Sequence, residues 1–297
     1  MMFEGIYPAL FSVYDENLNV KKETVEKLIN YHLSKGVSGF YVCGNTGECK
    51  VLPVRTRKQM AEAAVDANKG RGKIIVHIGA ATLEDTYELI DHCNTLKIDA
   101  ISSLPPTFGV YYNIDETIKY YRLIAKRSKH PVIAYIWGET GQTATEIARR
   151  IMEIDNVIGL KLTISDYYAF INIKQINGGN INLLNGPDET MICGLATGAD
   201  GAIGTSYNMF PKLAVSVYEA FKAGDMKKAL ELQRKLTALI GVILARGTSE
   251  TLALCKAAMA MQGFDMGYTV EPATKLSKER IEKLRKTLEE KDYFNVL

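Results

Sequence analysis

Long apolar runs are missing from this 297-residue chain. None reaches the roughly eighteen consecutive apolar residues that a membrane-spanning helix needs. The N-terminus, MMFEGIYPALFSV, also lacks a basic segment followed by a long apolar one, so it does not resemble a secretion signal. Neither sign of charge dominates, because 36 basic and 34 acidic residues are spread evenly. We therefore expect a cytoplasmic protein whose partners include neither membranes nor nucleic acids.

Cysteine and histidine are scarce, and their spacing does not suit a metal site. The five cysteines are odd in number and include no C-x-x-C pair, which argues against a disulfide framework and a zinc site. We expect them to be reduced and mostly buried. The four histidines also lack a metal-ligand spacing, and neither a G-x-G-x-x-G segment nor a P-loop is present. The sequence therefore predicts neither a bound metal nor a nucleotide cofactor.

The chain does contain a repeated alternation of strand-like and helix-like segments. Eight apolar runs have the character of strands. They begin at Gly5, Gly39, Lys73, Ala100, Pro131, Val157, Ile181 and Gly201. Stretches with helical periodicity lie between them, and several open with Thr or Asp, which are favoured N-cap residues. The clearest of these stretches cover residues 24–36, 56–70, 82–97, 115–129 and 143–154.

This alternation favours one fold class. Strands that alternate with helices imply right-handed crossovers and a parallel sheet. Eight such units in roughly 220 residues fit an α/β fold of the closed (β/α)8 type, a TIM barrel, better than a doubly wound sheet. From about Ala214 onward the pattern is helical only. We expect a catalytic (β/α)8 barrel at residues 1–224 and a C-terminal helical extension at residues 225–297, packed together as a single structural unit.

An unusual lysine lies in the sixth strand-like run, VIGLKLT. Lys161 stands in the middle of this apolar run, where an uncompensated charge is costly to bury. Taken alone, such a lysine is more often a rim residue with its ammonium group in water. Tyr135, in the fifth run VIAYIW, is likewise an ordinary strand residue when taken alone. Both residues, however, lie near the carboxyl ends of neighbouring strands, where the active groups of such barrels gather, so we expect them to share a pocket.

A desolvated lysine beside a tyrosine suits one kind of chemistry. Burial lowers the pKa of a lysine toward neutrality, and the neutral amine attacks a ketone. The protonated imine that results is an electron sink, so a nearby carbon–carbon bond can break or form while the tyrosine carries a proton. In the turn GNTGE, residues 44–48, backbone N–H groups and the Thr46 hydroxyl can hold a carboxylate. The residues therefore predict a lysine-dependent aldolase for a keto acid.

Three motifs resemble a known superfamily: GNTGE, the tyrosine near the end of the fifth strand, and GLKLT in the sixth. In these relative positions they are similar to the class I aldolases of the N-acetylneuraminate lyase and dihydrodipicolinate synthase superfamily. The resemblance covers essentially the whole chain. It implies a homotetramer of TIM barrels that forms a lysine imine with pyruvate and needs no other cofactor. It also implies that Lys161 forms the Schiff base, Tyr135 transfers a proton, and Asn45 with Thr46 binds the substrate carboxylate.

A more specific resemblance, to the sialic acid lyase branch, lies in the segments NGPDE and GTSYN after the seventh and eighth strands. It implies cleavage of N-acetylneuraminate or a similar 2-keto-3-deoxy sugar acid to pyruvate and N-acetylmannosamine. The residues implied to bind the sugar tail are Thr163, Gly186, Asp188, Glu189 and Thr205. Carboxylates and hydroxyls suit a hydroxyl-rich substrate, which needs hydrogen-bond acceptors. Taken alone, the PDE segment is also typical of a helix start.

Departures from these patterns leave alternatives open. Asn45 stands where the branch has Ser or Thr, and YIWGETG is shorter than the usual loop after the fifth strand. Dihydrodipicolinate synthesis is the weaker alternative, because Glu139 stands near the place of a carboxylate-binding arginine and would repel an acidic aldehyde. The tyrosines of that branch are also out of register here, at Tyr111 and Tyr112. Another 2-keto-3-deoxy acid aldolase and a non-catalytic barrel that binds keto acids remain as further alternatives.

Overall fold

The computed structural model describes residues 3–106, 112–243, 250–273 and 275–295. Eight parallel strands form one sheet in the order β1-β8-β7-β6-β5-β4-β3-β2. Their bounds are β1 (Gly5–Pro8), β2 (Gly39–Val42), β3 (Lys73–His77), β4 (Ala100–Ser103), β5 (Val132–Trp137), β6 (Val157–Thr163), β7 (Asn182–Asn185) and β8 (Gly201–Gly204). All eight strands predicted from the sequence are present, and each begins within one residue of its predicted start.

The two ends of this strand order also meet, so that the sheet closes on itself. Ala9, one residue beyond β1, forms a parallel bridge with Tyr41 of β2. The N–H of Leu10 donates to the carbonyl oxygen of Tyr41 at 2.9 Å. The predicted α/β fold, a TIM barrel with a C-terminal helical extension, is therefore confirmed.

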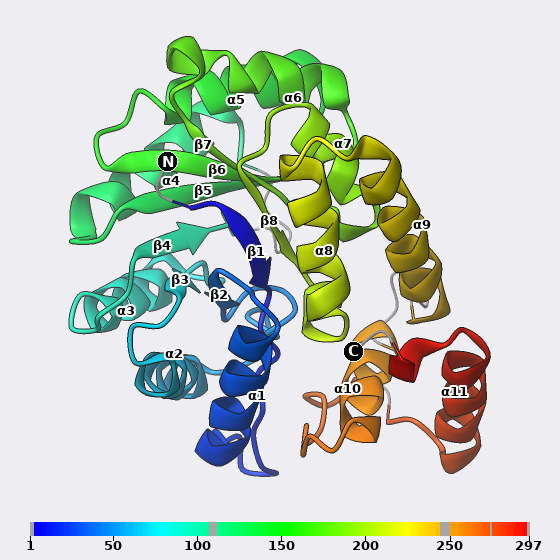
Figure 1. The fold of residues 1–297 in the computed structure, drawn as a ribbon. Coiled ribbons are helices and arrows are strands. Elements are labelled where there is room, and N and C mark those ends of the chain that lie inside the picture. Colours follow the sequence, from blue (N-terminus) through cyan, green and yellow to red (C-terminus); the bar gives the residue numbers. More distant parts are fainter. Residues whose placement is uncertain (1–2, 107–111, 244–249, 274, 296–297) are drawn as a thin grey trace.

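Helices follow the strands and surround the barrel (Figure 1). They are α1 (Lys22–Ser34), α2 (Val54–Asn68), α3 (Leu83–Cys93), α4 (Ile114–Arg127), α5 (Gly141–Ile151), α6 (Tyr167–Lys174), α7 (Met191–Ala196) and α8 (Pro211–Lys222). Local sequence explains several of their starts. The Thr82 side chain accepts a hydrogen bond from the N–H of Asp85 at the start of α3, and Asn113 forms a capping box with Glu116 at the start of α4.

In the described part of the C-terminal extension there are three more helices: α9 (Met226–Ile243), α10 (Glu250–Met261) and α11 (Lys278–Glu290). Figure 1 shows α9 beside α8, with α10 and α11 next to each other near the C-terminus. The sequence did not mark α10 as a separate helix. Its segment, ETLALCKAAMAM, is apolar almost throughout, so it lacks the alternation of polar and apolar faces by which a surface helix is predicted.

The hydrophobic core has two layers, one on each side of the strands. The outer layer lies between the strands and the surrounding helices and contains most of the buried apolar residues. The smaller inner layer fills the barrel with alternate residues of the strands, such as Tyr7, Tyr41, Ile133 and Leu184. Because side chains alternate along β5 and β6, Tyr135 and Lys161 lie on the inner side, directly above this filling.

Candidate active site

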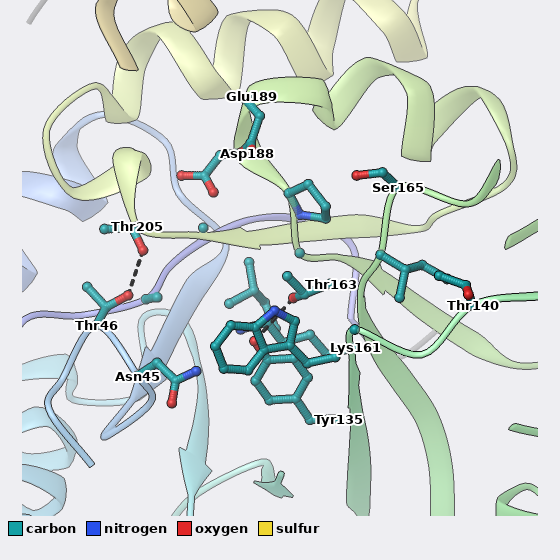
Figure 2. A pocket seen from close by; sticks show the side chains of 18 residues that line it. Asn45, Thr46, Tyr135, Thr140, Lys161, Thr163, Ser165, Asp188, Glu189 and Thr205 are labelled. Atoms are coloured by element: carbon teal, nitrogen blue, oxygen red, sulfur yellow. Dashed lines mark hydrogen bonds between the residues drawn. The ribbon is translucent and has the colours of Figure 1, made fainter. Parts of the chain in front are cut away.

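A cavity of about 500 Å³ opens at the carboxyl ends of the barrel strands (Figure 2). All nine residues expected from the sequence line it: Asn45, Thr46, Tyr135, Lys161, Thr163, Gly186, Asp188, Glu189 and Thr205. They come from segments spread over 160 positions of the chain, and the closed barrel brings them together. Their individual roles remain predictions, but their common location is a finding.

Lys161 lies at the base of the cavity and is only 6% exposed. Its Nζ atom lies 4.3 Å from the ring centroid of Tyr135 and 4.3 Å from that of Tyr41. Burial lowers the pKa of Lys161 to about 7, although the carboxylate of Asp188 opposes this shift. Near neutral pH, a substantial fraction of this lysine is therefore the uncharged, nucleophilic amine.

Tyr135 pairs with Lys161 across β5 and β6, so the two side chains start from adjacent positions of the sheet. Its hydroxyl oxygen accepts a hydrogen bond from Oγ1 of Thr163 at 3.2 Å. Its backbone N–H donates to the Tyr121 hydroxyl of α4 at 3.1 Å, which fixes the strand at this point. Burial raises the pKa of Tyr135 to about 12, so its phenol keeps its proton at neutral pH.

The turn after β2 forms another wall of the cavity. Asn45 and Thr46 both face the cavity from this turn. The hydroxyl of Thr46 lies 2.7 Å from that of Thr205, which follows β8, so one hydrogen bond joins the two loops (Figure 2). The amide oxygen of Asn45 accepts a hydrogen bond from the thiol of Cys49 at 3.4 Å. This bond orients the Asn45 side chain at the rim of the site.

Asp188 and Glu189 begin a short 3-10 turn after β7 that leads into α7, so the PDE segment does also start a helix. The carboxylate of Asp188 accepts a hydrogen bond from the N–H of Ser206 at 2.6 Å. Burial raises the pKa of this carboxyl group. Gln233 and Thr237 of α9 donate to the backbone carbonyl of Glu189 at 3.2 and 2.8 Å. Part of the extension therefore supports the acidic wall of the cavity.

The atoms around Gly186 leave no room for a side chain at this position. A Cβ atom at this position would lie 2.0 Å from Oγ1 of Thr163 and 2.7 Å from the carbonyl oxygen of Leu162. The N–H of Gly186 donates to this same carbonyl at 2.7 Å. Glycine therefore lets the end of β7 approach β6 without displacing the Thr163 side chain, which donates to Tyr135.

The loop after β5 contributes to the cavity differently from what its sequence indicates. Trp137, Gly138 and Thr140 line the main cavity. Glu139 instead borders a neighbouring cavity that Tyr112 and Tyr121 also line, so its charge does not face the main cavity. Glu139 thus lies beside the main cavity and not in its lining, and its repulsion of an acidic aldehyde stays a prediction. Tyr111 lies outside the described residues.

A comparison with known protein families shows which family this chain belongs to. The Dihydrodipicolinate synthetase family profile matches residues 2–291. The chain belongs to this family. It is 32% identical to the N-acetylneuraminate lyase of Clostridium perfringens over 98% of this chain and 100% of that protein. It is 30% identical to that of Mediterraneibacter gnavus over 94% of this chain and 90% of that one.

Solved structures agree with this placement in the dihydrodipicolinate synthetase family. The N-acetylneuraminate lyase of Proteus mirabilis superposes with a TM-score of 0.90 and 28% identity, covering 99% of this chain and 100% of that one. The sialic acid aldolase of Ruminococcus gnavus superposes with a TM-score of 0.91 and 26% identity, covering 99% of both chains. The fold of this family member is thus shared with sialic acid aldolases along its full length.

Several residues of the site in this member of the dihydrodipicolinate synthetase family were missed by sequence reasoning. Tyr41 contacts Lys161 but looks like any strand aromatic. Glu48, the last residue of GNTGE, forms a buried ion pair with Lys256 of α10. A buried partner for Glu48 could have been sought, because the turn carries no other charged residue that could pair with the glutamate if the turn is buried. Ser165 also lines the cavity without a distinctive sequence signal.

Other features considered from the sequence are the cysteines, possible metal sites and possible membrane-spanning helices. The five cysteines are free, and all but Cys193 are buried, as predicted. Within the described residues, no group of three or more His, Cys, Asp or Glu side chains is arranged to hold a metal ion. None of the helices in the described part of the chain has the length and apolar character needed to cross a membrane.

Proposed function

We propose that this protein is a class I aldolase that cleaves N-acetylneuraminate, or a similar 2-keto-3-deoxy sugar acid, to pyruvate and N-acetylmannosamine. The observation that carries the proposal is the buried Lys161, whose pKa is lowered to about 7 at the base of a polar cavity. Membership in the family and the similarity to named sialic acid lyases support the choice of substrate.

The reaction begins at the keto carbon, C2, of the open-chain sugar acid. The neutral amine of Lys161 adds to C2, and loss of water with uptake of one proton leaves a protonated imine, which returns this proton when the imine is finally hydrolysed. The substrate carboxylate next to C2 is held by the turn that carries Asn45 and Thr46, through the Thr46 hydroxyl and backbone N–H groups. This placement orients C2 toward the lysine at the base of the cavity.

Cleavage breaks the bond between C3 and C4. The proton of the C4 hydroxyl leaves, the C4 oxygen becomes an aldehyde oxygen, and the bond electrons move through C3 into the imine to give an enamine. Tyr135 carries the C4 proton. Because the pKa of Tyr135 is about 12, the phenol acts as a relay that accepts this proton while passing on its own, and the proton passed on is the one that C3 of the enamine takes up. Protonation of the enamine at C3 and hydrolysis of the imine then release pyruvate and free Lys161.

The opposite wall binds the remaining polyhydroxy chain. Asp188, Glu189 and Thr205 present oxygen atoms to this part of the cavity, and Thr163 lies between this wall and Tyr135. Carboxylate oxygens accept hydrogen bonds from sugar hydroxyls, and Gly186 leaves room for the chain. An uncharged, hydroxyl-rich aldehyde product therefore fits this wall better than an acidic one, which the carboxylates would repel.

The test is mass spectrometry after borohydride reduction, with N-acetylneuraminate and with pyruvate alone, together with an assay of released pyruvate. We expect a reduced pyruvyl adduct on Lys161 in both cases and pyruvate release from the sugar acid. Lys161→Ala should form no adduct while remaining folded, and Tyr135→Phe should slow cleavage by about 10²- to 10⁴-fold.

Other outcomes would favour a different function for this protein. An adduct with pyruvate but no release from N-acetylneuraminate would favour another 2-keto-3-deoxy acid aldolase or a dihydrodipicolinate synthase. No adduct with either compound would favour a non-catalytic barrel that binds keto acids. The proposal also includes a homotetramer in the cytoplasm without a bound cofactor, and sedimentation of the purified protein as a monomer or dimer would contradict the tetramer.

A further inference from the structure

Tyr41 lies inside the barrel and contacts the reactive lysine from the side of β2. Its side chain is fully buried in the inner core layer. The centroid of its ring is 4.3 Å from Nζ of Lys161, the same distance as that of Tyr135. An ammonium group within about 6 Å of a ring centroid is attracted by the negative face of the ring. Lys161 is therefore placed between two aromatic rings contributed by different strands.

The position of the Tyr41 ring is fixed on several sides. Its hydroxyl donates to Oγ of Ser102 in β4 at 3.0 Å. The backbone at Gly44 packs so closely that a Cβ atom there would lie 2.5 Å from the ring. The imidazole of His77 lies next to it, with the two ring centroids 6.1 Å apart. The ring therefore cannot turn away from Lys161 without displacing the turn that carries Asn45.

We infer that Tyr41 is a positioning residue for the imine-forming lysine, holding Nζ against Tyr135 and stabilising the positive charge that this nitrogen carries as an ammonium group and as a protonated imine. This inference rests on the proposed function of Lys161. An aromatic face attracts a cation but offers no carboxylate that would hold the lysine permanently protonated. It therefore stabilises the charged intermediate while leaving the free amine able to attack.

Other titratable groups lie around Lys161, and their charges affect how its reactivity depends on pH. Asp188 faces it from the turn after β7, Cys49 from the turn after β2, and His77 from β3. Burial raises the pKa of the Cys49 thiol and lowers that of His77 well below its usual value, so both are uncharged near neutral pH. Of these groups, Asp188 supplies the negative charge. Removal of the Tyr41 ring leaves Asp188 in place and should lower the pKa of Lys161 further.

The experiment measures the rate of borohydride-trapped pyruvate adduct on Lys161 from about pH 6 to about pH 9. Tyr41→Phe keeps the ring, while Tyr41→Leu and Tyr41→Met remove it; Met retains more apolar volume if the Leu variant folds poorly. Ser102→Ala removes the hydrogen-bond acceptor of the Tyr41 hydroxyl and leaves the Tyr41 ring intact. We expect Tyr41→Phe and Ser102→Ala to stay within about threefold of the wild type. The ringless variants should react about tenfold more slowly, with a rate midpoint at lower pH.

The outcomes separate this inference from the proposed function. Wild-type protein that forms no adduct would overturn the proposed function and the inference with it. If the wild type reacts and a folded ringless variant shows the same rate and midpoint, Tyr41 has no positioning role. If Tyr41→Phe is as slow as Tyr41→Leu, the hydroxyl and not the ring is responsible, which also overturns the inference.

Discussion

Glu48 and Lys256 form an ion pair inside the protein, with Nζ of Lys256 2.8 Å from Oε2 of Glu48 and both side chains 4% exposed. The Tyr14 hydroxyl also donates to this carboxylate at 2.7 Å, and the N–H of Val270 donates to its other oxygen at 3.0 Å. Lys256 donates further to the carbonyl of Tyr268. This network connects the turn of Asn45 and Thr46 to the C-terminal extension.

Breaking this pair on one side should destabilise the protein strongly. Lys256→Met leaves the Glu48 carboxylate buried without its cation, which costs about 3–5 kcal/mol in the free energy of unfolding. The double variant Glu48→Gln/Lys256→Met should recover much of this loss because no unpaired charge remains. Urea unfolding monitored by circular dichroism measures both effects.

The exposed pair Lys228–Glu231 provides the control for this prediction. Its side chains are 50% and 68% exposed, so Lys228→Met should change the free energy of unfolding by no more than about 0.5 kcal/mol. An equal effect of Lys256→Met and Lys228→Met would show that the buried pair does not stabilise the fold.

The rate of imine formation should depend on pH near neutrality. The neutral amine is the nucleophile, so the rate of trapped pyruvate adduct should rise as pH increases through the pKa of Lys161, about 7, and then level off. Single-turnover trapping at saturating pyruvate measures this profile. A rate that keeps rising to the usual lysine pKa of about 10.4 would mean that burial does not tune Lys161.

Lys161 should also influence how stability varies with pH. Its folded-state pKa, about 7, lies below the unfolded value of 10.5, so between these values the unfolded chain binds a proton that the folded chain has released. Below about pH 7 both states are protonated and the folded state bears the full cost of the buried charge. Stability from this group therefore rises with pH across that window, by up to about 1.4 kcal/mol per pH unit.

Lys161→Met removes this dependence and makes the prediction measurable. The variant should exceed the wild type in free energy of unfolding most at about pH 6, and the difference should shrink as pH approaches about 10. Urea unfolding of both proteins at several pH values gives the difference, from which groups common to both proteins cancel. Two parallel stability curves would contradict the prediction.

Gly186→Ala should damage catalysis through Thr163. The added methyl group would overlap Oγ1 of Thr163 and the carbonyl of Leu162, and Thr163 would lose its hydrogen bond to Tyr135. A displaced catalytic group of this kind can reduce kcat by about 10²-fold. Steady-state assays of pyruvate release measure the loss.

A matched glycine tests whether the effect is local. Gly241, in α9, has no atom within 4 Å of the place where a Cβ would lie. Gly241→Ala should therefore keep full activity and raise the free energy of unfolding by up to about 1 kcal/mol, because alanine is the better helix residue. Full activity in Gly186→Ala would exclude crowding of Thr163 as a catalytic defect.

Much of the fold could be predicted because, at the start of each strand, helical periodicity gives way to a short run of apolar residues. The runs from Gly5 to Gly201 alternate with helical stretches at regular spacing, and a parallel barrel is the arrangement that such a repeat favours. Lys161 and Tyr135 could be placed together because side-chain direction along a strand follows from position alone. Because the carboxyl ends of parallel strands lie at one end of a barrel, the residues there could be predicted to line one cavity.

The rest could not be predicted because it depends on contacts between distant segments. Glu48 and Lys256 are 208 positions apart, and Thr46 and Thr205 are 159 apart. Neither partner carries a local signal of the other. The same applies to Glu139, since a loop's backbone path decides which of two adjacent cavities its side chain borders.

The ion pair with Lys256 also has a consequence for the order in which the protein matures during synthesis. Every described residue that lines the cavity lies at or before Thr205, so a growing chain contains this described lining before α10 has been made. Until Lys256 and Val270 emerge, Glu48 lacks both its cation and one of its backbone hydrogen-bond donors, so the network that holds its turn is incomplete. Within the described residues, the C-terminal extension thus supports the turn of Asn45 and Thr46 without lining the cavity itself.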